Sequence, residues 1–483
     1  MATSPTFQPR RFPLRLRPVG ILAAAILVAA TSAVTGWTGL SGQSTSTTSG
    51  DAAALPNRAA AGDRSSAAGA VDIPGAGALP PSGSLAILDH NIGLWTKTVQ
   101  ANPSDFLSLT NLAILYHARA RLTADLADHQ RALEAARSAM KIAPTQTQAA
   151  DLEAAILYSL HDFKGAFTAA DALVRSHPAD LGAMATRADA SIELGNLAAA
   201  RADLQALNAA APGPAIDVRL ARLAAVGGDL GGAVKLAQTA RDGAAREGSD
   251  PGFYAYALAE YERGAGDPAA AESGYRAALE IRAGDLGALL GLARIQAFDG
   301  RLNDAIASLQ AAVAIAPTPE AEGLLGDLLA SRGGPGDDVA SATAYGTVRL
   351  TRTLSALAGT VYDRVLIKFD LDHGAGSAAV AEARAGLADR SDYGAHDLLA
   401  WALHASGQDD EAWSESQAAM ASGAADARTL YHAGAIAAAR GDAATAERLL
   451  DGALGLGPAL DPLERAAAEG LRAGLASGGM SAH

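Results

Sequence analysis

Two groups of residues have types and spacing that could bind a metal ion. The first is Asp370-Leu371-Asp372-His373-Gly374, which begins like a calcium loop because its carboxylates alternate before a glycine. The glycine and the terminal acid fall out of register, since Glu382 comes one residue too late for such a loop. We therefore interpret this stretch as a turn between two helices.

The second group is His396 and His404, eight residues apart in a stretch with helical periodicity. On a helix they would be separated by roughly 80° around the axis, and no third ligand is near in the sequence. Packed or solvated histidines explain them better. The chain has no cysteine, which excludes disulfides, thiol nucleophiles and zinc–cysteine sites. We predict no metal.

Sequence motifs of enzymes are absent from the chain. It contains no Gly-rich loop ending in Gly-Lys-Ser/Thr, no His-Glu-x-x-His and no Gly-x-Ser-x-Gly. We therefore predict no catalytic residue and no cofactor, and we expect that the protein is not an enzyme. Function must then depend on a surface, and the elements that build the surface come next.

Two copies of one unit, offset by 34 residues, occupy Tyr393–Leu460. Within each half of a copy, apolar or small residues recur at i, i+3, i+4 and i+7, which is one face of an α-helix. Gly407 and Gly441 separate the halves. Glycine ends a helix and lets the chain turn back. Each copy is therefore predicted to be a helical hairpin.

This pattern resembles the tetratricopeptide repeat (TPR) family, in its bacterial form with an N-terminal signal or membrane anchor. The family has an early Leu-Gly or Leu-Ala, a glycine turn, alanines in the second helix and a late proline. Leu399-Ala400, Ala412 and Pro458 match these places, and the frame extends over residues 106–460. The resemblance implies an all-α fold, a right-handed superhelical solenoid of about ten helical hairpins. Leu or Ala replaces most of the family's aromatic residues.

Composition fits stacked helices that approach closely. The 483 residues are 49% hydrophobic but only 5% aromatic. The net charge is −14, and because the first 20 residues carry four arginines and no acid, the remainder carries −18. An acidic body argues against nucleic acid as a partner, since neutralising phosphates requires a basic face.

An uncharged segment near the amino terminus, residues 19–40, could cross a bilayer as a helix of roughly 33 Å. Arginines precede it and no charge follows until Asp51. This asymmetry holds the amino terminus in the cytoplasm and places the body outside. The segment also fits a secretory signal peptide with a cleavage motif at Thr31-Ser32-Ala33, and a buried core helix is a further alternative.

The sequence suggests six parts. Residues 41–84 are rich in Ser, Thr, Gly, Ala and Pro and have no periodicity, which predicts a disordered linker. The full division is 1–18 basic cytoplasmic region, 19–40 signal peptide or transmembrane anchor, 41–84 linker, 85–105 N-terminal cap helix, 106–460 repeat array, and 461–483 C-terminal capping helix and tail.

The resemblance implies a concave groove lined by the first helix of each hairpin. The predicted groove-facing residues are Asp151, Asp189, Arg222, Tyr256, Glu260, Arg294, Asp327, Arg364, Lys368, Trp401 and Tyr431. Seven of these form the predicted partner-binding set, because Arg and aromatic residues are enriched in binding hot spots: Arg222, Tyr256, Arg294, Arg364, Lys368, Trp401 and Tyr431. The alternative is that these bases pair with neighbouring acids. An acidic partner segment with an apolar anchor would suit the second half of the groove.

The predicted function is a non-enzymatic scaffold that binds a protein or peptide partner outside the cytoplasm, anchored by one membrane segment. A secreted soluble binding protein, or an accessory subunit of an envelope enzyme or transport complex, is the alternative. The sequence identifies neither the partner nor the oligomeric state.

Overall fold

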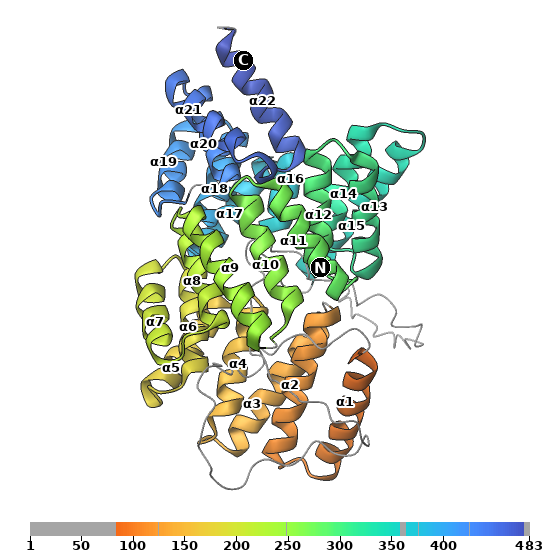
Figure 1. The fold of residues 1–483 in the computed structure, drawn as a ribbon, viewed down its shortest axis with the longest axis vertical. Helices are drawn as coiled ribbons and strands as arrows, with labels where there is room; N and C mark the ends of the chain where they lie inside the picture. The colour runs from red at the N-terminus through yellow and green to blue at the C-terminus, as the bar shows by residue number, and fades with distance from the viewer. Residues whose placement is uncertain are drawn as a thin grey trace, which may run out of the picture.

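The computed structural model describes residues 84–123, 125–247, 249–357, 364–374, 376–424 and 426–477. Every regular element in these ranges is helical, which confirms the all-α prediction (Figure 1). The first helix is α1 (Ser84–Ala101) and the last is α22 (Pro462–Ala476), with a short 3-10 helix, η1 (Gly457–Ala459), before it. Between them, α2 to α21 form ten consecutive hairpins.

The bounds of the hairpin helices are as follows. The first helices are α2 (Phe106–Thr123), α4 (Thr147–Ser159), α6 (Leu181–Glu193), α8 (Pro214–Val226), α10 (Pro251–Gly264), α12 (Leu286–Phe298), α14 (Pro319–Arg332), α16 (Arg364–Asp372), α18 (Tyr393–Ala405) and α20 (Ala427–Ala439). The second helices are α3 (Leu126–Ile142), α5 (Phe163–Ser176), α7 (Leu197–Ala210), α9 (Leu230–Glu247), α11 (Pro268–Ile281), α13 (Leu302–Ile315), α15 (Asp337–Leu357), α17 (Gly376–Asp389), α19 (Asp409–Met420) and α21 (Ala443–Gly455).

Glycine turns and aspartate caps shape the hairpins. Gly407 and Gly441 have φ angles of +73° and +81°, the left-handed region that glycine enters without strain, so the predicted turns are confirmed. The helix after such a turn often begins with an aspartate cap. The Asp442 carboxylate, for example, accepts a hydrogen bond from the Thr445 backbone N–H at 3.1 Å. His161, at φ +61°, takes the corresponding turn position between α4 and α5.

Small residues let the two helices of a hairpin approach closely. A Cβ atom on Gly434 in α20 would lie 2.9 Å from Leu450 Cγ in α21. A Cβ on Gly291 in α12 would overlap the ring of Tyr275, a side chain in α11 that is fully buried. Close packing of backbones therefore depends on glycine at these positions.

Replacing Gly434 by leucine should destabilise the protein by about 1–3 kcal/mol, because the added side chain would push α20 and α21 apart. Thermal and urea unfolding measure this cost. Gly470→Leu is the matched control, since Gly470 is exposed on α22 with no atom within 4 Å of the added Cβ. Equal stability of the two variants would contradict the packing shown for Gly434.

The first helices form the inner layer of the array and the second helices the outer layer. Successive first helices touch one another, as α10 touches α12 and α18 touches α20. In α12 every residue of Ala288–Gln296 is buried, all the way around the helix. In α13, by contrast, the buried residues, Ala305, Ile306, Leu309 and Ala312, share one face. Charged residues of the first helices are therefore held inside the coil.

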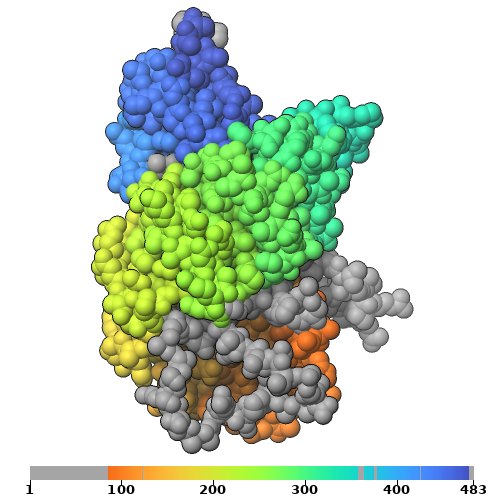
Figure 2. Space-filling model, in the orientation of Figure 1, coloured from red at the N-terminus to blue at the C-terminus, as the bar shows by residue number. Residues whose placement is uncertain are grey.

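The coil returns on itself, so that repeats far apart in sequence touch. The Lys164 ammonium donates to the Ala388 carbonyl at 2.9 Å, and the Ser391 hydroxyl donates to the Leu194 carbonyl at 3.3 Å. Further along, the turn at residues 227–229 meets the turn at 421–423. Figure 2 shows the C-terminal repeats, in blue, directly against the green repeats in the middle of the chain. We call this line of contacts the seam.

The predicted membrane segment, residues 19–40, lies outside the described residues, as do the predicted parts 1–18 and 41–83 of the chain. Within the part of the chain that the structure describes, no helix is both long enough and apolar enough to span a bilayer.

Candidate functional site

Arg222, the first base of the predicted partner-binding set, lies inside the coil next to the seam. Its guanidinium pairs with Glu193 and donates to the Tyr158 hydroxyl at 2.7 Å. The same Glu193 carboxylate also pairs with Arg390, which reaches it from the other side of the seam. Only 1% of Glu193 is exposed, so one buried carboxylate joins two arginines.

Arg294, on α12, is also buried and paired. It contacts Glu320 of α14 and Asp461 at the start of α22, each at 2.8 Å. Burial alone would lower the pKa of Arg294, but the carboxylates of Asp461 and Glu320 outweigh it and raise the pKa. The arginine is therefore a fixed charge that joins the middle of the array to the C-terminal helix.

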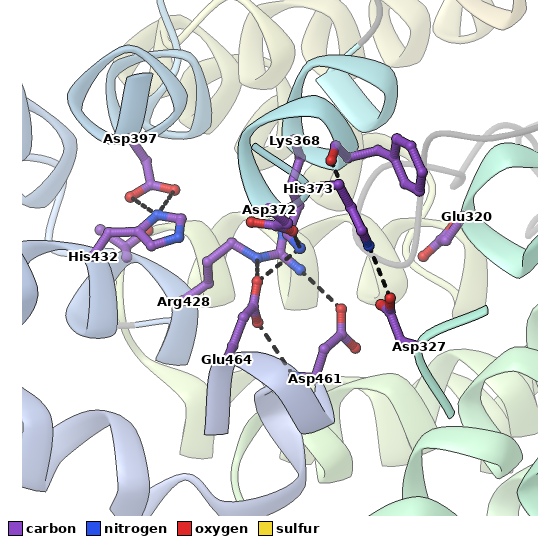
Figure 3. A network of polar contacts seen from close by, with 12 residues as sticks. Glu320, Asp327, Lys368, Asp372, His373, Asp397, Arg428, His432, Asp461 and Glu464 are labelled. Atoms are coloured by element: carbon purple, nitrogen blue, oxygen red, sulfur yellow. Dashed lines mark hydrogen bonds and ion pairs between the residues drawn. The ribbon is translucent and has the colours of Figure 1, made fainter. Parts of the chain in front are cut away.

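Arg364 and Lys368 lie one turn apart on α16. Arg364 contacts Asp392 at 2.6 Å. The Lys368 ammonium lies 2.6 Å from Asp372 on its own helix and 2.9 Å from Glu464 of α22 (Figure 3). Lys368 thus meets the same helix as Arg294 does.

The predicted aromatic residues differ in their surroundings. Tyr256 lies against Tyr275, with ring centroids 6.3 Å apart. Trp401 is partly buried and stacks on His432, with centroids 4.2 Å apart and planes at 10°. Tyr431 is 7% exposed and lies beside Trp401 at 5.6 Å. Trp401 and Tyr431 therefore share one apolar cluster, whereas Tyr256 belongs to another.

Three bases from three first helices converge on the start of α22, and we call Arg294, Lys368 and Arg428 the basic triad. Arg428, on α20, contacts Glu464 at 2.8 Å and Asp461 at 3.6 Å. In Figure 3, Lys368 and Arg428 lie on either side of Glu464, and Asp461 lies beside them. Two carboxylates of one helical turn thus contact all three bases.

The capping geometry of α22 presents these carboxylates. Asp461 precedes Pro462, the first residue of the helix, and its backbone N–H donates to the Glu464 carboxylate at 3.2 Å. Burial alone would raise the pKa of Glu464, but Arg428 and Lys368 outweigh it and lower the pKa well below its ordinary value. Both acids of this turn are therefore ionised at neutral pH.

The comparison with known families agrees with this architecture. The sequence profile described as "Tetratricopeptide repeat" matches residues 262–328, which run from the end of α10 to α14. Ten hairpins of the same kind follow one another along the described chain. The chain is a tetratricopeptide repeat protein.

Solved structures similar to this TPR protein share 15% sequence identity with it. The human IFIT1 dimer with PPP-AAAA has a TM-score of 0.42 and covers 65% of this chain and 72% of that one. The human IFIT1 dimer with m7Gppp-AAAA gives 0.43, with 70% and 77% covered. MamA gives 0.27, with 34% and 93% covered. Scores this low carry no information on function. No curated protein matches the sequence.

In this TPR protein the bases of the inner layer pair with acids of neighbouring repeats, the alternative that the sequence left open. Arg294 with Glu320 and Arg364 with Asp392 each join one first helix to the region of the next. The predicted groove acids are also engaged, with Asp189 on Arg219 and Asp327 on His373, each at 3.0 Å. A partner-binding role for the predicted set stays a prediction.

Sequence reasoning missed Arg428, Asp461 and Glu464 as members of the site. Asp461 was recognised as a helix cap, but no sequence pattern indicates which repeat a terminal helix will contact. A signal was present in the composition: Asp461 and Glu464 are three residues apart, as a capping box requires, and both are acidic where the predicted groove is basic.

The residues first considered as metal ligands are engaged by separate partners. His396 contacts Glu415 at 2.7 Å and His404 contacts Asp409 at 2.6 Å. Asp370 pairs with Arg352 at 2.9 Å. Among the described residues, no group of three or more potential ligands is placed to hold a metal ion.

Proposed function

We propose that this TPR protein is a non-enzymatic scaffold that binds another protein on the inner layer of its coil. The observation that carries the proposal is that hairpins and their two flanking helices account for nearly all described residues, so the repeat surface is what the chain offers. The family's helical hairpins commonly hold an extended peptide or a partner's helix.

The inner layer is favoured over the outer one because charge and aromatic side chains gather there. The basic triad lies within the same C-terminal half as Trp401 and Tyr431, although the chain outside its first 20 residues carries −18. An acidic partner would be repelled by the remaining surface and attracted to this region, which favours orientation and rapid encounter. The acidic charge of the body also makes nucleic acid a poor partner.

Capture of partners by the full chain tests this proposal. Lys368→Glu should lower capture, because it reverses one of the bases that would meet an acidic partner. Lys235→Glu is the control with the same charge change, since Lys235 is exposed on the outer helix α9. Both variants need circular dichroism to verify folding. Equal capture by two folded variants would place the binding surface elsewhere.

We also propose that the body lies outside the cytoplasm, held by residues 19–40. Four arginines before this segment and no charge until Asp51 support that orientation. Protease added to intact cells should then digest the array, and a protected array in the cytosolic fraction would contradict it. A mature protein that begins after residue 33 would instead support the secreted alternative.

A further inference from the structure

The start of α22 has the chemistry that the sequence predicts for a partner of the basic region. Asp461 and Glu464 supply two carboxylates, one helical turn apart, to the basic triad. Leu460, just before them, is 3% exposed and belongs to the apolar cluster that also holds Tyr431 and Trp401. An acidic turn with an apolar anchor therefore already occupies this site.

The rest of α22 is held loosely. Of its 15 residues only Glu464 and Ala468 are buried, and Leu463 is 42% exposed. Its outer half is joined to α21 through Arg472 and Asp451, a pair at 2.7 Å in which both side chains are partly exposed. Exposed pairs of this kind contribute little. In Figure 1 the C-terminal end of α22 projects beyond the array. Attachment of the helix thus depends mainly on the triad and Leu460.

The segment before α22 also closes the C-terminal end of the seam. Arg263 of α10 donates to the Pro458 carbonyl at 3.4 Å, and Arg294 of α12 holds Asp461. A segment that leaves the triad would therefore release these contacts between the middle and the end of the chain. Occupation of the triad and closure of the coil are consequently coupled.

We propose that the basic triad is a receptor for an acidic, helix-initiating protein segment, that residues 457–476 occupy it in this chain, and that a partner binds by displacing them. The partner segment would carry an apolar residue followed by two carboxylates three positions apart, as Leu460, Asp461 and Glu464 do. The tethered segment competes at a high effective concentration, so the closed chain binds a partner more weakly than the open one. This inference rests on the proposed protein-binding function.

The probe for the test is a fluorescent synthetic peptide with the sequence of residues 457–476, titrated into the full-length chain. In the chain that carries Asp461→Asn with Glu464→Gln, the tethered segment loses its charge and leaves the triad. The peptide should bind this variant at least tenfold more tightly than it binds wild type. Glu469→Gln is the matched control, because Glu469 is exposed on α22 and contacts only Arg465 among the described ion pairs. It should behave like wild type.

Two further arms identify the receptor. A peptide that carries Asp461→Asn with Glu464→Gln should not bind, and Lys368→Ala with Arg428→Ala in the open chain should abolish binding of the wild-type peptide. If the double variant does not fold, Glu464→Gln alone retains the Asp461–Arg294 pair and should give an intermediate gain. Equal peptide affinity in all folded chains would overturn the proposal.

Other outcomes separate this inference from the function on which it rests. Peptide binding to the open chain, with no protein captured by any variant, would support the receptor and remove the scaffold function. Protein capture that excess peptide does not reduce would retain the function and overturn the receptor. Dimers that Glu464→Gln abolishes, without peptide binding, would overturn it in favour of exchange of α22 between two copies.

Discussion

Replacing Glu193 by glutamine should lower the free energy of unfolding by about 3–5 kcal/mol. The carboxylate is 1% exposed and is shared by Arg222 and Arg390, and the Tyr158 hydroxyl donates to it at 3.2 Å. Glutamine keeps the shape but removes the charge, so two arginines are left near the seam without their common counterion. Urea unfolding at neutral pH measures the loss.

The matched control for this change is Glu411→Gln. Glu411 pairs with Arg384 on the surface, where both side chains are about half exposed, at 48% and 49%. A pair in that position is worth about 0–1 kcal/mol because water screens both charges. A Glu193 variant as stable as the Glu411 variant would show that the seam does not depend on this buried carboxylate.

Gly228→Ala should cost about 2–4 kcal/mol. Gly228 has a φ of +84°, which alone costs an alanine about 1–2 kcal/mol. Its Cβ would also overlap the Gly423 carbonyl oxygen across the seam, so the two turns would have to separate. Thermal unfolding gives the stability, and small-angle scattering would report an opening of the coil.

Gly441→Ala separates the two causes. Gly441 lies at the corresponding turn of the tenth hairpin with φ +81°, and no atom lies within 4 Å of an added Cβ. It therefore carries the backbone cost without the overlap. If both alanine variants lose the same stability and keep the same dimensions, the contact between residues 228 and 423 contributes nothing.

The hairpins could be predicted from the sequence because each depends on local signals. The periodicity within Tyr393–Leu460 and the glycines at 407 and 441 act over a few residues, and the structure places α18 to α21 accordingly. The long second helix predicted for the seventh hairpin is α15, with 21 residues. Gly434, predicted as a contact residue between paired helices, lies against Leu450.

The seam and the occupation of the basic triad could not be predicted in the same way. Glu193 and Arg390 are 197 positions apart, and their meeting depends on small rotations that accumulate over six hairpins. The groove-facing set was chosen from helix positions alone, which indicate that Arg294 faces inward but not that Asp461 contacts it. The pairing of inner bases with acids is a property of the whole coil rather than of one repeat.

Hydrogen exchange of the full chain, with and without a captured partner, tests most directly whether binding occurs on the inner layer at the site that α22 occupies. The account predicts slower exchange in α12, α16 and α20, which carry Arg294, Lys368 and Arg428, and faster exchange in α22 as it leaves the triad. Slower exchange confined to the outer helices, with α22 unchanged, would contradict it.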